Sequence, residues 1–590
     1  MLLQKEEHSP WYRHVFFNWV SPLIAIGKKQ HVSDEHLLTL NRAEDSAQCG
    51  KDFAGIFCQE QQSQPRPVIS TLWKLHKKTF FKISLLALVN LICTTTNPLI
   101  IRELLKALKS TEPIALAGWS LAAALMVTAL TANLSIHHVY HASLKLGMRM
   151  RAGLVVAIYE KALRLNHRAR AQSNTGEIVN LMANDAARVY NVASMLHSAW
   201  VMPLQGIVII SALFYIMGPA TFAGLAVMII MLYFSSRRAR KLMSGRRRLM
   251  EHSDQRVSLM SEILNGIRVI KFYAWERSFL ARIKKIRNRE LEELHGLARE
   301  SALVNILFLS TPIFVGLATF SARLLTGESL EIEDVFSALA FFGILRPVMS
   351  QLPMTFSGYI DANIATQRIE NFLAREEFEA RKSNSELAAG SIQISRGAVN
   401  WGAGTAELNL IDMHIRSGEF IVVLGPVGGG KTSFLHVLMR ELENSNNLVT
   451  SNGRFAFVSQ LPWIMNASVR DNITFGHPDN ELLYRNAIAA CALEDDLAQL
   501  AQSDDTEIGE RGVNLSGGQK QRISLARAVY SDADIFLLDS PLSAVDSKVG
   551  KSIFKQCLRG LLAKKTRILV THNAEHAAKA DRVLWIQNGT

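Results

Sequence analysis

The chain has 590 residues, of which 48% are hydrophobic and 20% charged, and its formal net charge is +13 at pH 7. This length predicts more than one domain, and a mean hydropathy of +0.11 argues against a wholly water-soluble protein. The cysteines form no CxxC pair, which argues against a metal site and against a disulfide framework; they are Cys49, Cys58, Cys93, Cys491 and Cys557.

The positive charge alone would suit a nucleic-acid-binding protein, but its distribution does not. Basic residues gather directly after an apolar run, at Arg237, Arg238, Arg240, Lys241, Arg246, Arg247 and Arg248. An excess of Lys and Arg beside a hydrophobic segment is typical of the cytosolic side of a membrane protein. We therefore expect a lipid bilayer, and no nucleic acid, as a partner.

Residues 1–80 are amphipathic and are predicted to form a separate N-terminal segment. The opening sequence, MLLQKEEHSP, is charged and lacks the apolar core of a cleavable signal peptide. Aromatic residues then precede the sequence SPLIAIGKKQ, at Trp11, Tyr12, Phe16, Phe17 and Trp19. By composition alone, this stretch could also be an ordinary globular start.

Residues 81–369 are predicted to form an all-α membrane domain with six spans. A transmembrane helix needs about 20 apolar residues. The predicted spans are residues 83–101, residues 113–136, two helices within 189–236, residues 301–322 and residues 335–359. Gly218-Pro219 predicts the turn between the third and fourth spans, Asn97-Pro98 predicts a kink, and Arg346-Pro347 predicts an interruption of the sixth.

The charges of the loops predict the orientation of the spans. The basic loops, 143–170 and 237–290, are expected in the cytosol, and the segments 102–112 and 328–334 on the other side. Both termini are then cytosolic, in a multi-pass protein of the plasma or cytoplasmic membrane. The two basic loops are helical in pattern, so they should extend from the membrane into the cytosol.

Arg346 is a charged residue inside the sixth predicted span. A charge at the centre of a span costs about 2.5–3.5 kcal/mol on insertion scales, so such residues usually face a cavity or pair with another charge. We expect Arg346 to face a substrate cavity and to favour anions. An internal ion pair with a carboxylate of another helix is the alternative.

Residues 370–390 are predicted to be a linker, which ends in the polar sequence FEARKSNSELAAG. From residue 391 to 590 the pattern changes to alternating strands, loops and helices, which predicts an α/β ATPase domain. The sequence GPVGGGKT follows an apolar strand, predicted at 420–424, and opens a helix, predicted at 433–439, which is the context that a phosphate-binding loop requires. Its residues are Gly425, Pro426, Val427, Gly428, Gly429, Gly430, Lys431 and Thr432, followed by Ser433. Lys431 should reach the β- and γ-phosphates of ATP.

A second Gly-rich turn, LSGGQ, also opens a helix and is suited to bind a γ-phosphate through its backbone N–H groups. It contains Ser516, Gly517, Gly518 and Gln519. The apolar strand 535–538 follows and ends in Asp539, a carboxylate placed to hold Mg²⁺ together with Thr432. The sequence SAVD comes next, with Ser543 and Asp546.

These motifs resemble the Walker A, signature, Walker B and D-loop motifs of ABC transporters. The sequence HVFFNWVSPLIAIGKKQHVSDEHLLTL, the string YAWE within 266–276 and the stretch WIMNASVRDNITFG are similar to the first half of C-class members, the multidrug resistance-associated exporters and the cystic fibrosis chloride channel. The resemblance implies an interfacial "lasso" at the N-terminus. It also implies coupling helices within 174–189 and 266–276, although YAWE could instead be a packed aromatic cluster.

The resemblance assigns further residues of the ATP site. Trp401 would stack on adenine, with a core tryptophan as the alternative. Gln460 would contact Mg²⁺ and the membrane domain. His572, at the end of the predicted strand 568–571, would contact the γ-phosphate. Ser516 to Gln519 would face the ATP bound by a second ATPase domain, because such sites form between two domains.

Ser540 departs from the family pattern, because most active members carry Glu at this position as the general base. A serine hydroxyl cannot accept a proton near neutral pH, so we expect weak hydrolysis at this chain's own Walker site. A tolerated polar substitution is the alternative. The prediction is an ATP-driven half-transporter that exports amphipathic organic anions or lipophilic conjugates; an ATP-gated channel or a regulatory subunit is the alternative. It should pair with a second half-transporter, a heterodimer being favoured over a homodimer.

Overall fold

The computed structural model describes residues 10–31, 33, 41–109, 115–166, 169–170, 172–378, 387–400, 407–442, 448–509 and 515–589. The chain divides into two compact units. One consists of Met1–Tyr159 and Ile178–Leu373, and the other of Glu160–Glu177 and Ala374–Thr590. The first unit is helical, and the second is an α/β domain that also includes the loop after the second long helix.

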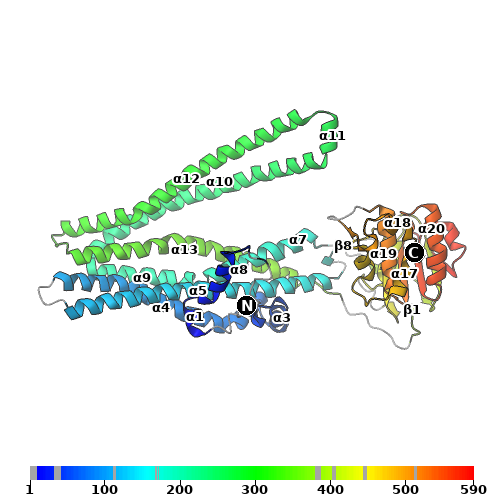
Figure 1. Cartoon of the computed structure of the whole chain (residues 1–590), viewed down its shortest axis with the longest axis horizontal. Helices are drawn as coiled ribbons and strands as arrows, with labels where there is room; N and C mark the ends of the chain where they lie inside the picture. Colours follow the sequence, from blue (N-terminus) through cyan, green and yellow to red (C-terminus); the bar gives the residue numbers. More distant parts are fainter. Residues whose placement is uncertain are drawn as a thin grey trace. The chain divides into compact units, whose positions relative to one another are not determined.

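Long helices build the first unit (Figure 1). Its N-terminal part consists of α1 (Trp11–Val15), α2 (Ser21–Gly27) and α3 (Ser46–Ser63). The later helices are α4 (Pro67–Lys109), α5 (Ala115–Arg164), α7 (Thr175–Asn180), α8 (Ala186–Met195), α9 (Ser198–Met217), α10 (Thr221–Asn265), α11 (Ile267–Phe272), α12 (Glu276–Leu325) and α13 (Ile332–Leu373). A π-helical turn, Leu181–Asp185, joins α7 to α8.

Five helical stretches of the described residues are long and apolar enough to cross a membrane. The stretch Thr175–Asn265 contains both α9 and α10, which meet at the 3-10 turn Gly218–Ala220. The turn predicted at Gly218-Pro219 is therefore confirmed, while the structure supports five candidate spans rather than specifically six. This number reflects the short turn, which leaves α9 and α10 in one apolar stretch.

The interruption predicted at Arg346-Pro347 is wrong, because α13 runs without a break from Ile332 to Leu373. Helix α4 likewise continues through Pro98. A proline removes one helical hydrogen bond, and neighbouring helices can satisfy the backbone groups that it frees. The hydroxyl of Ser337 on α13 also donates to the carbonyl of Pro98 itself at 2.9 Å, which connects α13 to α4 at the proline. For α13, burial of Leu345 and Val348 on either side of the proline holds the helix together.

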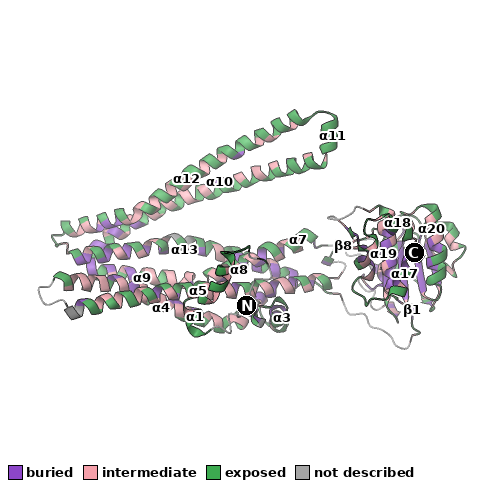
Figure 2. Cartoon of the chain, viewed as in Figure 1, coloured by how far each residue is buried: buried purple, intermediate pink, exposed green. Residues whose placement is uncertain are grey.

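Helices α10 and α12 form a long hairpin whose tip is α11. Ion pairs connect the two helices along its length: Arg238 with Glu300 at 3.3 Å, Arg248 with Glu293 at 2.9 Å and Arg256 with Glu290 at 2.8 Å. Much of the hairpin is exposed (Figure 2). At its tip, Phe272, Tyr273 and Trp275 are all exposed, and the rings of Tyr273 and Trp275 stack 5.0 Å apart.

A five-stranded sheet in the order β12-β5-β11-β10-β7 forms the centre of the α/β unit, and its strands are parallel. The strands are β5 (Phe420–Leu424), β7 (Phe455–Val458), β10 (Ile535–Asp539), β11 (Thr566–Val570) and β12 (Arg582–Trp585). Short antiparallel strands precede or flank it: β1 (Ile392–Ile394), β2 (Gly397–Asn400), β3 (Glu407–Leu410), β4 (Met413–Ile415), β6 (Val449–Ser451), β8 (Ala467–Ser468) and β9 (Glu507–Ile508).

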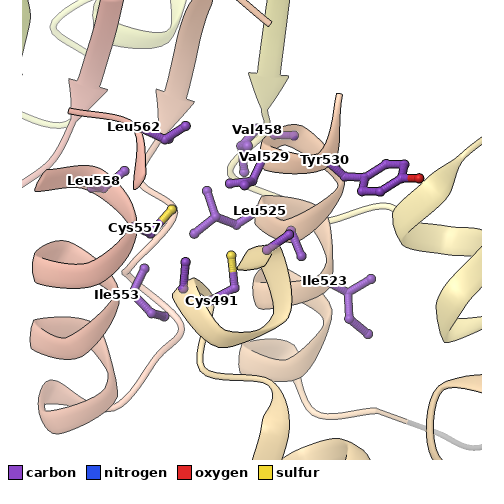
Figure 3. Close-up of a cluster of buried hydrophobic side chains, with 14 of the residues drawn as sticks. Val458, Cys491, Ile523, Leu525, Val529, Tyr530, Ile553, Cys557, Leu558 and Leu562 are labelled. Atoms are coloured by element: carbon purple, nitrogen blue, oxygen red, sulfur yellow. The ribbon is translucent and has the colours of Figure 1, made fainter. Parts of the chain in front are cut away.

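Helices of this unit pack against the central sheet and bury its hydrophobic core. They are α14 (Lys431–Leu438), α16 (Val469–Thr474), α17 (Glu481–Ala490), α18 (Glu494–Gln499), α19 (Gly517–Tyr530), α20 (Ser547–Ile553), the π-helix Phe554–Leu561 and α21 (Ala574–Ala577). One face of the sheet packs on a cluster that includes Leu525, Val529 and Leu558 (Figure 3). The thiols of Cys491 and Cys557 lie in the same cluster, where their mutual hydrogen bond and burial raise the pKa of Cys491.

Candidate functional site

The predicted phosphate-binding loop connects β5 to α14 at the carboxyl end of the sheet. The predicted strand 420–424 is confirmed, and α14 begins at Lys431, two residues before the predicted helix start. Gly425 has φ +148°, and a Cβ there would lie 2.0 Å from the carbonyl oxygen of Ile586. Gly428 and Gly430 also have positive φ, which favours glycine. The loop conformation therefore depends on these glycines.

Lys431, Thr432 and Asp539 lie close together at the start of α14. Lys431 is buried, and its Nζ donates to the carbonyls of Gly425 at 3.0 Å and Pro426 at 2.7 Å. The hydroxyl of Thr432 donates to Oδ2 of Asp539 at 2.8 Å, and Asp539 is also buried. A cation, a hydroxyl and a carboxylate thus converge at the N-terminus of α14, beside loop N–H groups. This donor set fits a nucleotide phosphate with a divalent cation.

The signature residues form the start of α19. Ser516 is its N-cap and makes a capping box with Gln519: the N–H of Gln519 donates to the Ser516 hydroxyl at 3.2 Å, and the N–H of Ser516 to Oε1 of Gln519 at 2.8 Å. A Cβ at Gly518 would lie 2.8 Å from the carbonyl oxygen of Ala544, so glycine permits close packing of the D-loop. At Gly517, no atom of the described residues lies within 4 Å of such a Cβ.

The structure also shows signature contacts that the sequence did not reveal. Asp496 on α18 accepts hydrogen bonds from Nε2 of Gln519 at 2.9 Å and from Arg522 at 3.0 Å. Gln521 is buried and donates to the carbonyl of Ser459, the residue before Gln460. Asp496 lies within an acidic run, EDD, that has no motif of its own, so the sequence offered no signal for its role.

Ser540 and His572 line one cavity of about 300 Å³ beside the end of the sheet. Ser540 is buried and has φ +50°, an uncommon conformation for a residue other than glycine. Its N–H donates to the carbonyl of Val570 at 3.0 Å, and its carbonyl accepts from the hydroxyl of Ser543 at 2.8 Å. His572 is exposed and follows β11. The structure therefore places Ser540, at the general-base position, beside the same cavity as His572, the residue predicted to contact the γ-phosphate.

A second histidine, His576, lines the same cavity and was not predicted. Its ring stacks on Phe554 with centroids 4.4 Å apart, and burial lowers the pKa of the imidazole.

The remaining predicted site residues have fewer contacts in the described part of the structure, or lie outside it. Gln460 is exposed after β7, and Asp546 precedes α20 without a side-chain capping bond. Trp401 lies outside the described residues.

Arg346 lies on α13 in an apolar cavity of about 290 Å³ between α10, α12 and α13. Its guanidinium is 4.5 Å from the ring centroid of Phe308. Among the residues that the structure describes, Arg346 has no carboxylate partner, which favours the cavity interpretation over the internal ion pair. Four methionines line the same space: Met228, Met231, Met349 and Met354.

Comparisons with known proteins agree with this division into a membrane part and an ATP site. The model of the ABC transporter transmembrane region matches residues 80–348, and the ABC transporter model matches residues 408–543. The chain is 33% identical to ABC transporter C family member 8 of Dictyostelium discoideum, over 100% of its own length and 37% of that protein.

Two further relatives are similar over nearly the whole chain. ATP-binding cassette sub-family C member 2 of Homo sapiens is 34% identical, over 95% of this chain and 37% of the relative. Sub-family C member 3 of Mus musculus is 34% identical, over 99% of this chain and 41% of the relative. The chain thus spans about two fifths of the length of these proteins.

Proposed function

Because the chain belongs to the C family of ABC transporters, we propose that it acts as an ATP-dependent half-transporter. The observation that carries this proposal is the Thr432–Asp539 hydrogen bond beside Lys431, in a chain that also has long apolar helices. We propose six membrane passes, with α9 and α10 as separate spans, both termini in the cytosol and export of amphipathic organic anions. Uphill accumulation of an anion in proteoliposomes would support transport, and passive conductance alone would contradict it.

ATP supplies phosphates for the loop between β5 and α14, and we propose that Mg²⁺ accompanies it. Lys431 would pair with phosphate oxygens in place of the carbonyls that it now contacts. Thr432 and Asp539 would hold the cation, with Gln460 completing the set from the loop after β7. His572 would contact the γ-phosphate from the cavity that it shares with Ser540.

The partner that we propose is a second ABC half, and a heterodimer is favoured. Since no atom of the described residues lies within 4 Å of a Cβ at Gly517, the signature would be accessible to a nucleotide bound by another ATPase domain. The exposed Phe272, Tyr273 and Trp275 at the hairpin tip would dock on an ATPase domain, which supports the coupling role proposed for YAWE. No contact among the described residues favours the alternatives, an ATP-gated channel or a regulatory subunit.

Arg346→Ala should lower transport of anionic substrates more than transport of neutral ones. The guanidinium is the cationic group of an otherwise apolar cavity, and the methionines can adapt to varied apolar bodies. Initial rates for a matched pair, a carboxylate and its methyl ester, would measure the effect in proteoliposomes. Arg485→Ala, at an exposed position of α17 in the ATPase unit, serves as the control. An equal loss for both compounds with normal folding would contradict an anion-binding role.

A further inference from the structure

The segment after α13 is held against the loop after α5. Leu165 and Glu377 form an isolated antiparallel β-bridge. Backbone hydrogen bonds flank the bridge on both sides, from the N–H of Asn166 to the carbonyl of Glu376 at 3.3 Å and from the N–H of Phe378 to the carbonyl of Arg164 at 2.6 Å. We call this contact between residues 164–166 and 376–378 the clasp.

Charged side chains reinforce the clasp. Lys161, whose side chain is only 9% exposed, pairs with Glu377 at 2.8 Å. Arg375 pairs with Glu177 at 3.0 Å and also donates to the hydroxyl of Ser173. The side chain of Asn166 donates to Glu376 at 2.9 Å. Such a network fixes the segment more firmly than a single exposed ion pair would.

The last turns of α13, directly before the clasp, are also anchored. Asp185 in the π-helical turn is fully buried and pairs with Arg368 at 3.0 Å. Glu370 accepts from the N–H of Val68, at the start of α4, and pairs with Arg66 at 3.5 Å. Residues 368–378 are therefore bound successively to the π-helical turn, to α4 and to the loop after α5.

From these contacts we propose that the clasp is a coupling element, and the proposal rests on the proposed function. The clasped residues 376–378 precede β1 in the sequence, and β1, which begins at Ile392, is the first strand of this chain's own ATPase domain. If they move as one body with the end of α5, a movement of the ATPase domain reaches the first cytosolic loop through the clasp. Lys161, Arg375 and Glu377 are then positioning residues, and the clasp stays closed throughout the ATP cycle.

The double variant Leu165→Cys/Glu377→Cys tests this proposal directly. The same protein has a weakened clasp when the cysteines are reduced and a clasp closed by a disulfide when they are oxidised. Leu165 and Glu377 face each other without sharing a backbone hydrogen bond, because the bonds are made by the residues on either side. In antiparallel pairs of this kind the side chains lie close enough for a disulfide. The full chain would be placed in lipid nanodiscs. The readout is the change in hydrogen exchange of residues 174–189 on adding ATP and Mg²⁺, with the disulfide mapped by mass spectrometry.

We expect the reduced double variant to lose the ATP-induced change by about 5-fold or more, and the oxidised form to regain it. The charge variants provide a second test. Lys161→Glu should speed exchange at Asn166 and Phe378 together and weaken the ATP response, and Lys161→Glu/Glu377→Lys should restore both. Arg485→Glu, which breaks an exposed ion pair on α17, is the matched control and should behave like the unmodified chain.

Labelling by a photoreactive ATP analogue, measured on the same samples, separates the two proposals. If the unmodified chain is not labelled, the nucleotide site itself is overturned, and the coupling role with it. If labelling is normal, a full response from the reduced variant, or no response from the oxidised one, overturns the clasp alone.

Discussion

Lys431→Ala should greatly weaken ATP binding at this chain's own Walker site. Lys431 is the lysine of the phosphate loop, and its Nζ is already held at the loop by the carbonyls of Gly425 and Pro426. A hydrogen bond to a charged group contributes about 1.5–3 kcal/mol, which corresponds to roughly a 10- to 150-fold lower affinity for each bond lost. Photoaffinity labelling with an ATP analogue at increasing concentrations would measure this change.

The control must separate lost binding from lost folding. Lys431 is buried, so its removal could also disturb the loop. Lys555→Ala removes an exposed lysine of the same unit and should leave labelling unchanged. The thermal unfolding temperature without nucleotide should be similar for both variants. Unchanged labelling of a folded Lys431→Ala chain would show that the phosphate loop has been assigned wrongly.

The phosphate loop was predictable from the sequence because its determinants are contiguous. A strand, a run of glycines and a helix start fall within about twenty residues, and β5 has the predicted bounds. Asp539 was predictable for the same reason, since a buried apolar strand leads directly to it. The strand before His572 was less well placed: β11 begins at Thr566, two residues before the predicted start.

Contacts between distant segments could not be predicted in this way. Asp496 binds Gln519 and Arg522, which lie more than twenty positions later, and the bridge between Leu165 and Glu377 joins segments that share no motif. The helix interruption predicted at Pro347 failed for a related reason, because burial of neighbouring side chains outweighs one missing hydrogen bond. The predicted limits of the membrane domain, residues 81–369, remain predictions.

Ser540→Glu should raise ATP hydrolysis by the purified chain by about 10²–10⁴-fold, the usual contribution of a general base. Hydrogen bonds to the carbonyl of Val570 and from the hydroxyl of Ser543 fix the backbone of Ser540, so a new side chain should leave the backbone conformation unchanged. The adjoining cavity of about 300 Å³ has room for a longer side chain beside His572. A carboxylate there could orient and deprotonate a water molecule.

The measurement is phosphate release by the chain alone in lipid, with its self-association determined on the same sample. Ser540→Gln is the matched control, because it has nearly the size of Glu but cannot accept the proton. An equal gain from Gln would show that side-chain size rather than basicity limits the reaction. Vigorous turnover by the unmodified chain, with no gain from Ser540→Glu, would contradict an impaired site.

The partner decides what the unmodified site does. In a homodimer both sites would carry Ser540, and hydrolysis should stay slow unless His572 positions the water instead. His572→Ala separates these cases, since it should abolish any residual turnover of a homodimer that uses His572.

In a heterodimer, the signature that begins at Ser516 would complete the ATP site of the partner, which has its own Glu at the general-base position. Coexpression with such a half should then raise turnover without any change at Ser540, and mutation of Gly517 or Gly518 to Asp should remove that gain. A gain that survives these signature mutations would show that the two halves do not share a composite site.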